Sequence, residues 1–123
     1  MAQKYIVGDV VMYDNKIMVV KEPRDGSHFD LSCPKEGLVY CLVDIDEINP
    51  IPLTPEILEK NGWRKEQENY FNDSYHIFLE SEYEKYSAFK VVHNHVVWLR
   101  DVRNVSDLQH LLFGLGINQE MEV

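Results

Sequence analysis

The chain has 123 residues, and its 12 Lys and Arg against 21 Asp and Glu give a net charge of −9. This length fits one domain with a real hydrophobic core, and a hydrophobic fraction of 45% argues against a disordered protein. The acidic balance disfavours nucleic acid as a partner, because nucleic acid is held mainly by Lys and Arg.

The cysteine content and the start of the chain indicate the compartment. Cys33 and Cys41 are too few and too far apart for a disulfide framework or a zinc ribbon. The first residues lack the apolar run of a signal peptide, and no run is long enough to cross a bilayer. We therefore expect a cytoplasmic protein with reduced thiols and no membrane partner.

The first part of the chain is predicted to consist of strands. Two β-branched runs at 7–13 and 16–21 flank Asp14-Asn15, which predicts a hairpin, and 38–44 is a third strand. Residues 22–37 are typical of a long connecting segment with a short strand near 29–31. Residues 45–48 are expected to continue the third strand after a bend. This pattern is compatible with a small SH3-like barrel.

A short central helix should follow the stiff connector 49–52. Thr54 is the predicted N-cap, and Leu53 and Leu58 stand at the two positions of a hydrophobic staple. Gly62 should end this helix and let Trp63 fold back onto it. We expect Ile57, Leu58 and Trp63 to be buried.

The rest of the chain alternates again, with strands at 75–80, 88–92 and 96–99. Ser106 should cap a last helix, with Gln109 completing a capping box. Four leucines form one apolar stripe that should be buried: Leu108, Leu111, Leu112 and Leu115.

The predicted fold class is α+β with mostly antiparallel strands. It comprises an N-terminal SH3-like small barrel, a short central helix, a second antiparallel sheet and a C-terminal helix. We expect a single domain, 1–123, with a β-rich SH3-like part at 1–53 and a helix-strands-helix part at 54–123.

His93 and His95 are the candidates for a metal site. On one extended strand both imidazoles would point to the same face and share a metal ion, given a third ligand from elsewhere. Alternatively, Asn94 between them lies in a tight turn, and the two histidines are exposed on either side. We favour the turn, so no metal and no cofactor is predicted.

The other candidate site residues are carboxylates that would meet a protein partner: Glu56, Glu59, Glu80, Glu82 and Glu84. The last three lie two apart, so on a strand they would form an acidic row for a cation or a basic partner surface. The alternative is a solvated edge whose charges discourage pairing with other strands.

Nothing in the sequence indicates an enzyme. It has no Gly-x-Ser-x-Gly elbow, neither cysteine has the flanks of a catalytic thiol, and the Gly-Leu-Gly at 114–116 follows a helix instead of opening one. We therefore predict no catalytic residue, and the oligomeric state stays open.

Residues 51–63 read Ile-Pro-Leu-Thr-Pro-Glu-Ile-Leu-Glu-Lys-Asn-Gly-Trp, after an early strand from Gly8 to Tyr13 and before a helix with Leu108-Gln109. In this outline the chain resembles a family of small uncharacterised proteins from prophages and mobile elements of gut bacteria. Many members have Tyr-x-His before the Leu-Gln, whereas this chain has 104–107, Asn-Val-Ser-Asp, and lacks that His. The resemblance implies a mobile-element setting and brings no activity, cofactor or catalytic residue.

Three functions follow from these observations. The leading hypothesis is a non-catalytic protein-interaction module, in one version an inhibitor of a host protein, whose partner has a basic surface. The second is a small-molecule or metal-binding module that uses His93 and His95. The third is an SH3-like nucleic-acid-associated regulator, which needs a basic patch: Arg64, Lys65, Arg100 and Arg103 would have to meet in space.

Overall fold

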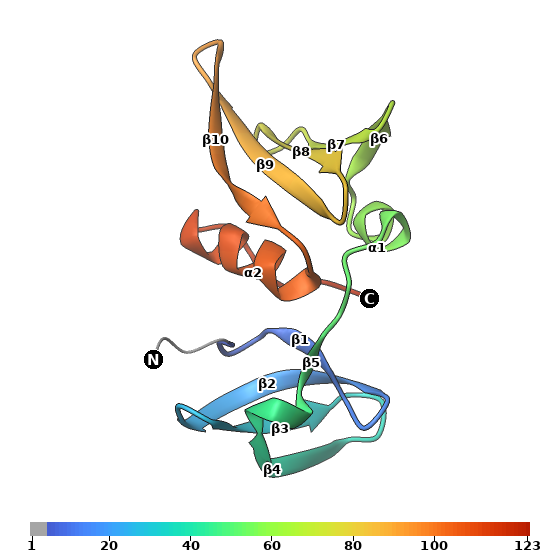
Figure 1. The fold of residues 1–123 in the computed structure, drawn as a ribbon, viewed down its shortest axis with the longest axis vertical. Coiled ribbons are helices and arrows are strands. Elements are labelled where there is room, and N and C mark those ends of the chain that lie inside the picture. The colour runs from blue at the N-terminus through green and yellow to red at the C-terminus, as the bar shows by residue number, and fades with distance from the viewer. Residues whose placement is uncertain (1–4) are drawn as a thin grey trace.

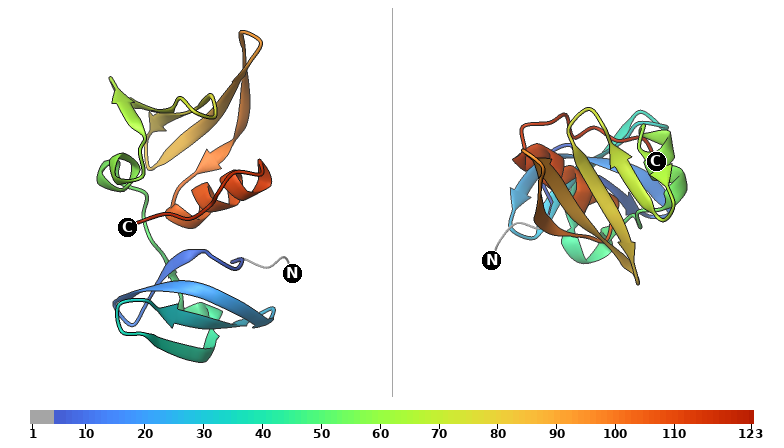
Figure 2. Two further views of the ribbon diagram at one scale, coloured as in Figure 1. Left: turned by 180° about the vertical axis from the view of Figure 1, so that it is seen from behind. Right: turned by 90° about the horizontal axis from the view of Figure 1, so that it is seen from above.

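The computed structural model describes residues 5–123 and has two antiparallel sheets and two helices, so the predicted α+β class is confirmed. The first sheet has the strand order β4-β3-β2-β1-β5, and the second has the order β10-β9-β8-β7-β6. The two sheets lie at opposite ends of the long axis, with helix α2 between them (Figures 1 and 2). Among residues 5–123, no helix is long and apolar enough to cross a bilayer.

The first sheet and its connections comprise β1 Val10–Tyr13, β2 Lys16–Asp25, β3 His28–Cys33, β4 Leu38–Asp44, the 3-10 helix η1 Ile45–Glu47 and β5 Asn49–Pro50. The rest of the chain comprises α1 Pro55–Lys60, β6 Arg64–Glu66, β7 Asn69–Asn72, β8 Ile77–Glu82, β9 Lys85–Val92, β10 His95–Val102 and α2 Val105–Gly114.

The first sheet is more regular than the sequence suggested. The hairpin at Asp14-Asn15 is confirmed, with φ values of 51° and 58°. The short strand predicted near 29–31 is confirmed as β3 His28–Cys33, but the long connecting segment predicted around it is wrong, because β2 continues to Asp25. β2 accommodates Pro23 because β1 pairs with it only as far as Val19, which leaves the end of β2 without a strand on that side.

The segment after β4 also differs from the expectation. Residues 45–47 form the 3-10 helix η1 instead of continuing the strand. Asp44 causes this turn, since its carboxylate accepts a hydrogen bond of 2.9 Å from the Asp46 N–H. η1 redirects the chain so that β5 can pair with β1 on the far side of the sheet.

The central helix forms as its capping residues predict. Thr54 Oγ1 accepts a hydrogen bond of 3.3 Å from the Ile57 N–H, and Leu53 and Leu58 are both buried. Gly62 adopts a φ of +86°, and the Trp63 N–H then donates to the Leu58 carbonyl at 3.0 Å. Ile57 differs from the expectation, because it is only partly buried against the core.

The last helix begins one residue before the predicted cap. Asn104, and not Ser106, is the N-cap, and its side chain accepts a hydrogen bond of 2.8 Å from the Asp107 N–H. Gln109 therefore takes no part in a capping box. The leucine stripe is buried at Leu108, Leu111 and Leu112, whereas Leu115 follows the last helical residue and is 37% exposed.

Two hydrophobic clusters stabilise the molecule. The smaller one lies within the first sheet, around Met18, Phe29 and Leu31. The larger one joins the second sheet to both helices, and it includes Val10 from β1. Helix α2 thus packs against both sheets.

Candidate functional site

The two histidines proposed as metal ligands lie at the tip of a hairpin. His93 and Asn94 have φ values of 48° and 67° and form the turn between β9 and β10, and His95 is the first residue of β10. Both histidines are exposed. Within residues 5–123, no three His, Cys, Asp or Glu side chains gather in a way that could hold a metal ion.

The candidate carboxylates are divided among three places. Glu80 and Glu82 lie on one face of β8, two residues apart. Glu84 lies in the following turn with a φ of 62°, so the three do not form one row. Glu56 and Glu59 are exposed on α1, away from that sheet face.

The four basic residues that a nucleic-acid regulator would need do not form a patch. Arg64 and Lys65 lie on β6, whereas Arg100 lies on β10 and Arg103 directly follows it. β6 and β10 are the two opposite edges of the second sheet. Arg64 contacts Glu66 and Asp73 at 2.6 and 3.0 Å, so its charge is already compensated.

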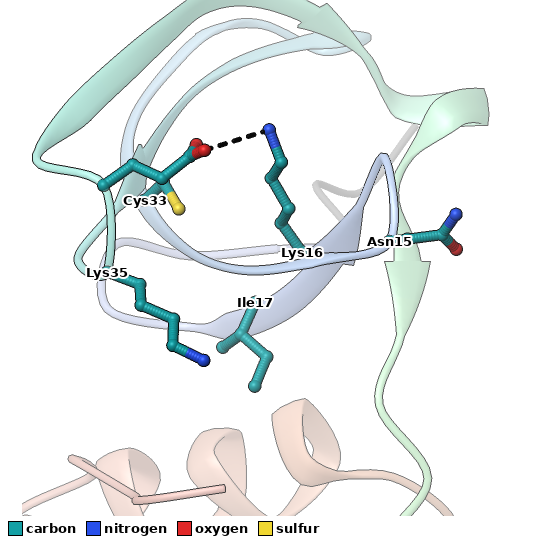
Figure 3. A pocket seen from close by; sticks show the side chains of 6 residues that line it. Asn15, Lys16, Ile17, Cys33 and Lys35 are labelled. Carbon is teal, nitrogen blue, oxygen red and sulfur yellow. Dashed lines mark ion pairs between the residues drawn. The ribbon is translucent and has the colours of Figure 1, made fainter.

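A cavity of about 340 Å³ opens on the first sheet beside the 14–15 turn (Figure 3). Its charged pair is Lys16 and Glu36, 3.2 Å apart, and the Tyr40 hydroxyl also donates to Glu36 at 3.1 Å. These two hydrogen bonds, the one from Lys16 first, lower the pKa of Glu36. The carboxylate is therefore a satisfied acceptor and is poorly suited to take a proton from a substrate.

A polar junction connects the first strand to the last helix. The buried Gln109 side chain accepts from the Val10 N–H at 2.8 Å and donates to the Gly8 carbonyl at 2.9 Å. Next to it, His110 Nε2 lies 2.6 Å from a carboxylate oxygen of the buried Asp9. These bonds join β1 to α2, which is an architectural role, although Asp9 Oδ1 is buried and has no hydrogen-bond partner among the described residues.

One face of the second sheet carries a row of aromatic side chains. Phe71 lies opposite Phe78, Phe78 opposite Phe89, and Phe89 opposite Trp98, on four successive strands. The Phe71 and Phe78 ring centroids are 5.5 Å apart, and those of Phe78 and Phe89 are 5.0 Å apart, with interplanar angles of 27° and 17°. The three rings are therefore stacked on one another along the sheet.

This row lies on the side of the sheet that faces away from the core. Its neighbours along the strands, Tyr70, Ile77 and Leu79, point to the opposite side and are buried under the helices. Trp98 is 57% exposed, and Val96, on the same side of β10, is 58% exposed. We call this surface the aromatic face and define it by six residues: Phe71, Phe78, Phe89, Val91, Val96 and Trp98.

Charged groups border the aromatic face. At the β6 edge, the Arg64 guanidinium lies 5.1 Å from the Phe71 ring centroid, held there by Glu66 and Asp73. Lys85 lies 2.9 Å from Asp101, and Glu80 forms no ion pair with any described residue. The surface thus combines stacked rings with carboxylates, and one end of the row already holds a cation over a ring.

The sequence reasoning missed the aromatic face, although a signal was present. Ile77-Phe78-Leu79 is apolar at three consecutive positions, so both faces of that strand are apolar. The pairing register that aligns four aromatic residues depends on contacts distant in sequence and cannot be read from a single strand.

Comparison of the chain with family models, curated proteins and solved structures finds no match.

Proposed function

We propose that this protein is a non-catalytic protein-interaction module that binds its partner through the aromatic face. The single observation that carries the proposal is the aromatic row across β7 to β10, which no described element covers. Large exposed apolar patches are unusual on soluble domains and mark places where another surface docks. Aromatic residues are also enriched in the centres of protein interfaces.

The geometry favours binding over a structural role for this row. The core of the second sheet is already supplied by its inner face, which packs on α1 and α2. Trp98 is more than half exposed and makes no ring contact with Phe89, so its faces are accessible. A tryptophan in such a position is the residue type that most often dominates binding energy.

The charges support a partner with a basic surface. Arg64 over Phe71 is an internal example of a cation that stacks on this row beside carboxylates. An Arg or Lys of the partner would stack on the exposed Trp98 in the same way, and the unpaired Glu80 lies two strands away on the same side of the sheet. The net charge of −9 would also attract a basic protein over a longer distance.

We further propose that the first sheet is an SH3-like small barrel. Its support is the order β4-β3-β2-β1-β5, in which four strands follow one another as hairpins and η1 returns the chain to pair β5 with β1. An experimental structure in which β5 and β4 curve toward each other would support the barrel, and one in which the sheet stays flat would contradict it.

We place the protein in the cytoplasm and its partner among host proteins. Two unpaired cysteines, one of them exposed, are compatible with a reducing compartment. The resemblance to prophage and mobile-element proteins supports a host partner, and inhibition of that partner is the outcome we propose.

Capture of partners from a bacterial lysate tests the proposed surface. The wild-type chain and Trp98→Ala are compared with Tyr83→Ala, a matched control because Tyr83 is an aromatic residue that is 88% exposed but lies outside the aromatic face. We expect the same protein to be captured by wild type and by Tyr83→Ala and to be lost with Trp98→Ala. Equal capture by both variants would exclude the aromatic face as the binding surface.

A further inference from the structure

The outermost strand of the second sheet has a free edge. β9 and β10 extend past β8, which pairs with β9 only from Lys85 to Lys90, and the hairpin projects as an arm (Figure 1). On the β10 side of the arm, Val96, Val97 and Trp98 are between 46% and 58% exposed. No described element lies beside this part of β10.

The turn at the tip of the arm determines which backbone groups face outward. His93 and Asn94 form a two-residue turn with both φ values positive, so Val92 and His95 are a hydrogen-bonded pair. Pairs alternate along an antiparallel ladder, so Val96 opposite Val91 and Trp98 opposite Phe89 are non-hydrogen-bonded pairs. The N–H and C=O groups of Val96 and Trp98 therefore point away from β9, toward the open edge.

Up to Trp98, this edge carries no proline, no bulge and no Asp, Glu, Lys or Arg. Edge strands are commonly protected by short length, charge, proline or a bulge. The opposite edge, β6, has only Arg64-Lys65-Glu66, all charged. In contrast, 95–98 reads His-Val-Val-Trp, and the irregularity in β10 comes only after Trp98. The edge is therefore a template for another extended strand.

We infer that the strand that pairs with this edge is β10 of a second copy of the chain, in an antiparallel, two-fold symmetric dimer. The charge distribution permits this occupant at the arm and disfavours it elsewhere on the molecule. Two molecules of net charge −9 repel each other, so they must meet where carboxylates are absent. Residues 85–100 are the longest stretch of the chain without Asp or Glu, and they include the whole arm.

The symmetric pairing satisfies both the backbone and the side chains. An isologous contact brings the same segment of each copy together, so the outward groups of Val96 and Trp98 find donors and acceptors on the partner strand. Val96 and Trp98 of the two copies then lie on the same side of one continuous sheet, and the two aromatic faces become neighbours. This dimer goes beyond the proposed partner binding, and either proposal can fail without the other.

Sedimentation of the untagged chain from micromolar to millimolar concentration tests the dimer. We expect the mass to rise from 14.5 kDa to twice that value as concentration increases. Val96→Pro should stay monomeric, because it removes an outward N–H that no internal ladder bond uses. Val96→Thr is the matched control, since it keeps the N–H and the branched shape, and it should still dimerise.

Amide hydrogen exchange on the wild type gives a second readout that needs no variant. The Val96 and Trp98 amides should exchange fast in the monomer and become protected at the concentration where the mass doubles. A monomer at every concentration would overturn the inference, and so would a dimer whose Val96 and Trp98 amides stay unprotected. If folded Val96→Pro is monomeric but still captures the lysate protein, the dimer and the partner surface are separate properties.

Discussion

The two faces of the second sheet are made by alternate residues of the same strands but differ in what lies against them. On β8, Ile77 and Leu79 are fully buried under the helices, whereas Phe78 between them is part of the aromatic row and is only partly buried. Both faces are apolar, so hydrophobicity alone does not separate a core from a binding surface. The difference is whether an element of the same chain covers the face.

The largest effect is expected on the inner face. Leu79→Ala should lower the free energy of unfolding by about 2–5 kcal/mol, because it leaves a cavity in the larger core. Phe78→Ala, at the adjacent position on the outer face, should lower it by less, because part of that ring already contacts water. Urea unfolding of both variants measures the two values, and a loss at Phe78 as large as that at Leu79 would contradict the comparison.

The second-largest loss of stability is expected from the polar junction beneath the inner face. Gln109→Ala leaves the buried Val10 N–H without its acceptor, and we expect a loss of about 1–3 kcal/mol in the free energy of unfolding. An unchanged urea midpoint for Gln109→Ala would mean that the junction contributes nothing to stability.

Helix α1 supports the inner face and should respond to loss of its cap. Thr54→Ala removes the acceptor for the Ile57 N–H and should destabilise the protein by about 1 kcal/mol in thermal or urea unfolding.

Charge reversals at Glu56 and Glu59 should leave both the melting temperature and partner capture nearly unchanged. If they abolish capture while the melting temperature holds, α1 and not the aromatic face is the interaction site.

The smallest effect concerns an ion pair at the border of the aromatic face. The hydrogen bond from Lys85 holds the pKa of Asp101 below its ordinary value of 3.8. A lowered carboxyl pKa stabilises the fold above pH 3.8, and that contribution is lost as the pH falls through the folded-state pKa. Lys85→Met should raise the Asp101 pKa toward 3.8, which NMR titration of the carboxyl carbon measures. An identical titration in both proteins would show that the pair is not formed in solution.

Local features of the sequence predicted the parts of the fold that depend on neighbouring residues. The Asp14-Asn15 hairpin, the Thr54 cap and the return of Trp63 at Gly62 all follow from the preferences of a few adjacent residues. The prediction of a capping box at Ser106 failed because Asn104, two residues earlier, is itself a good cap.

Features that join distant segments could not be predicted in the same way. The sequence pattern predicts a local cap for Gln109, whereas its side chain contacts Gly8 and Val10 about a hundred residues earlier. The aromatic row needs the register of β7 through β10, and a slip of one residue would turn these rings to the other face.

Photo-cross-linking tests the central claim, that the partner docks on the aromatic face, most directly. A photo-reactive amino acid is placed at position 98 in one protein and at position 83 in another, because both sites are exposed and only the first lies on the aromatic face. We predict a covalent adduct with a different protein from position 98, identified by mass spectrometry, and none from position 83. Adducts of equal yield from both positions, or from position 83 alone, would contradict the account.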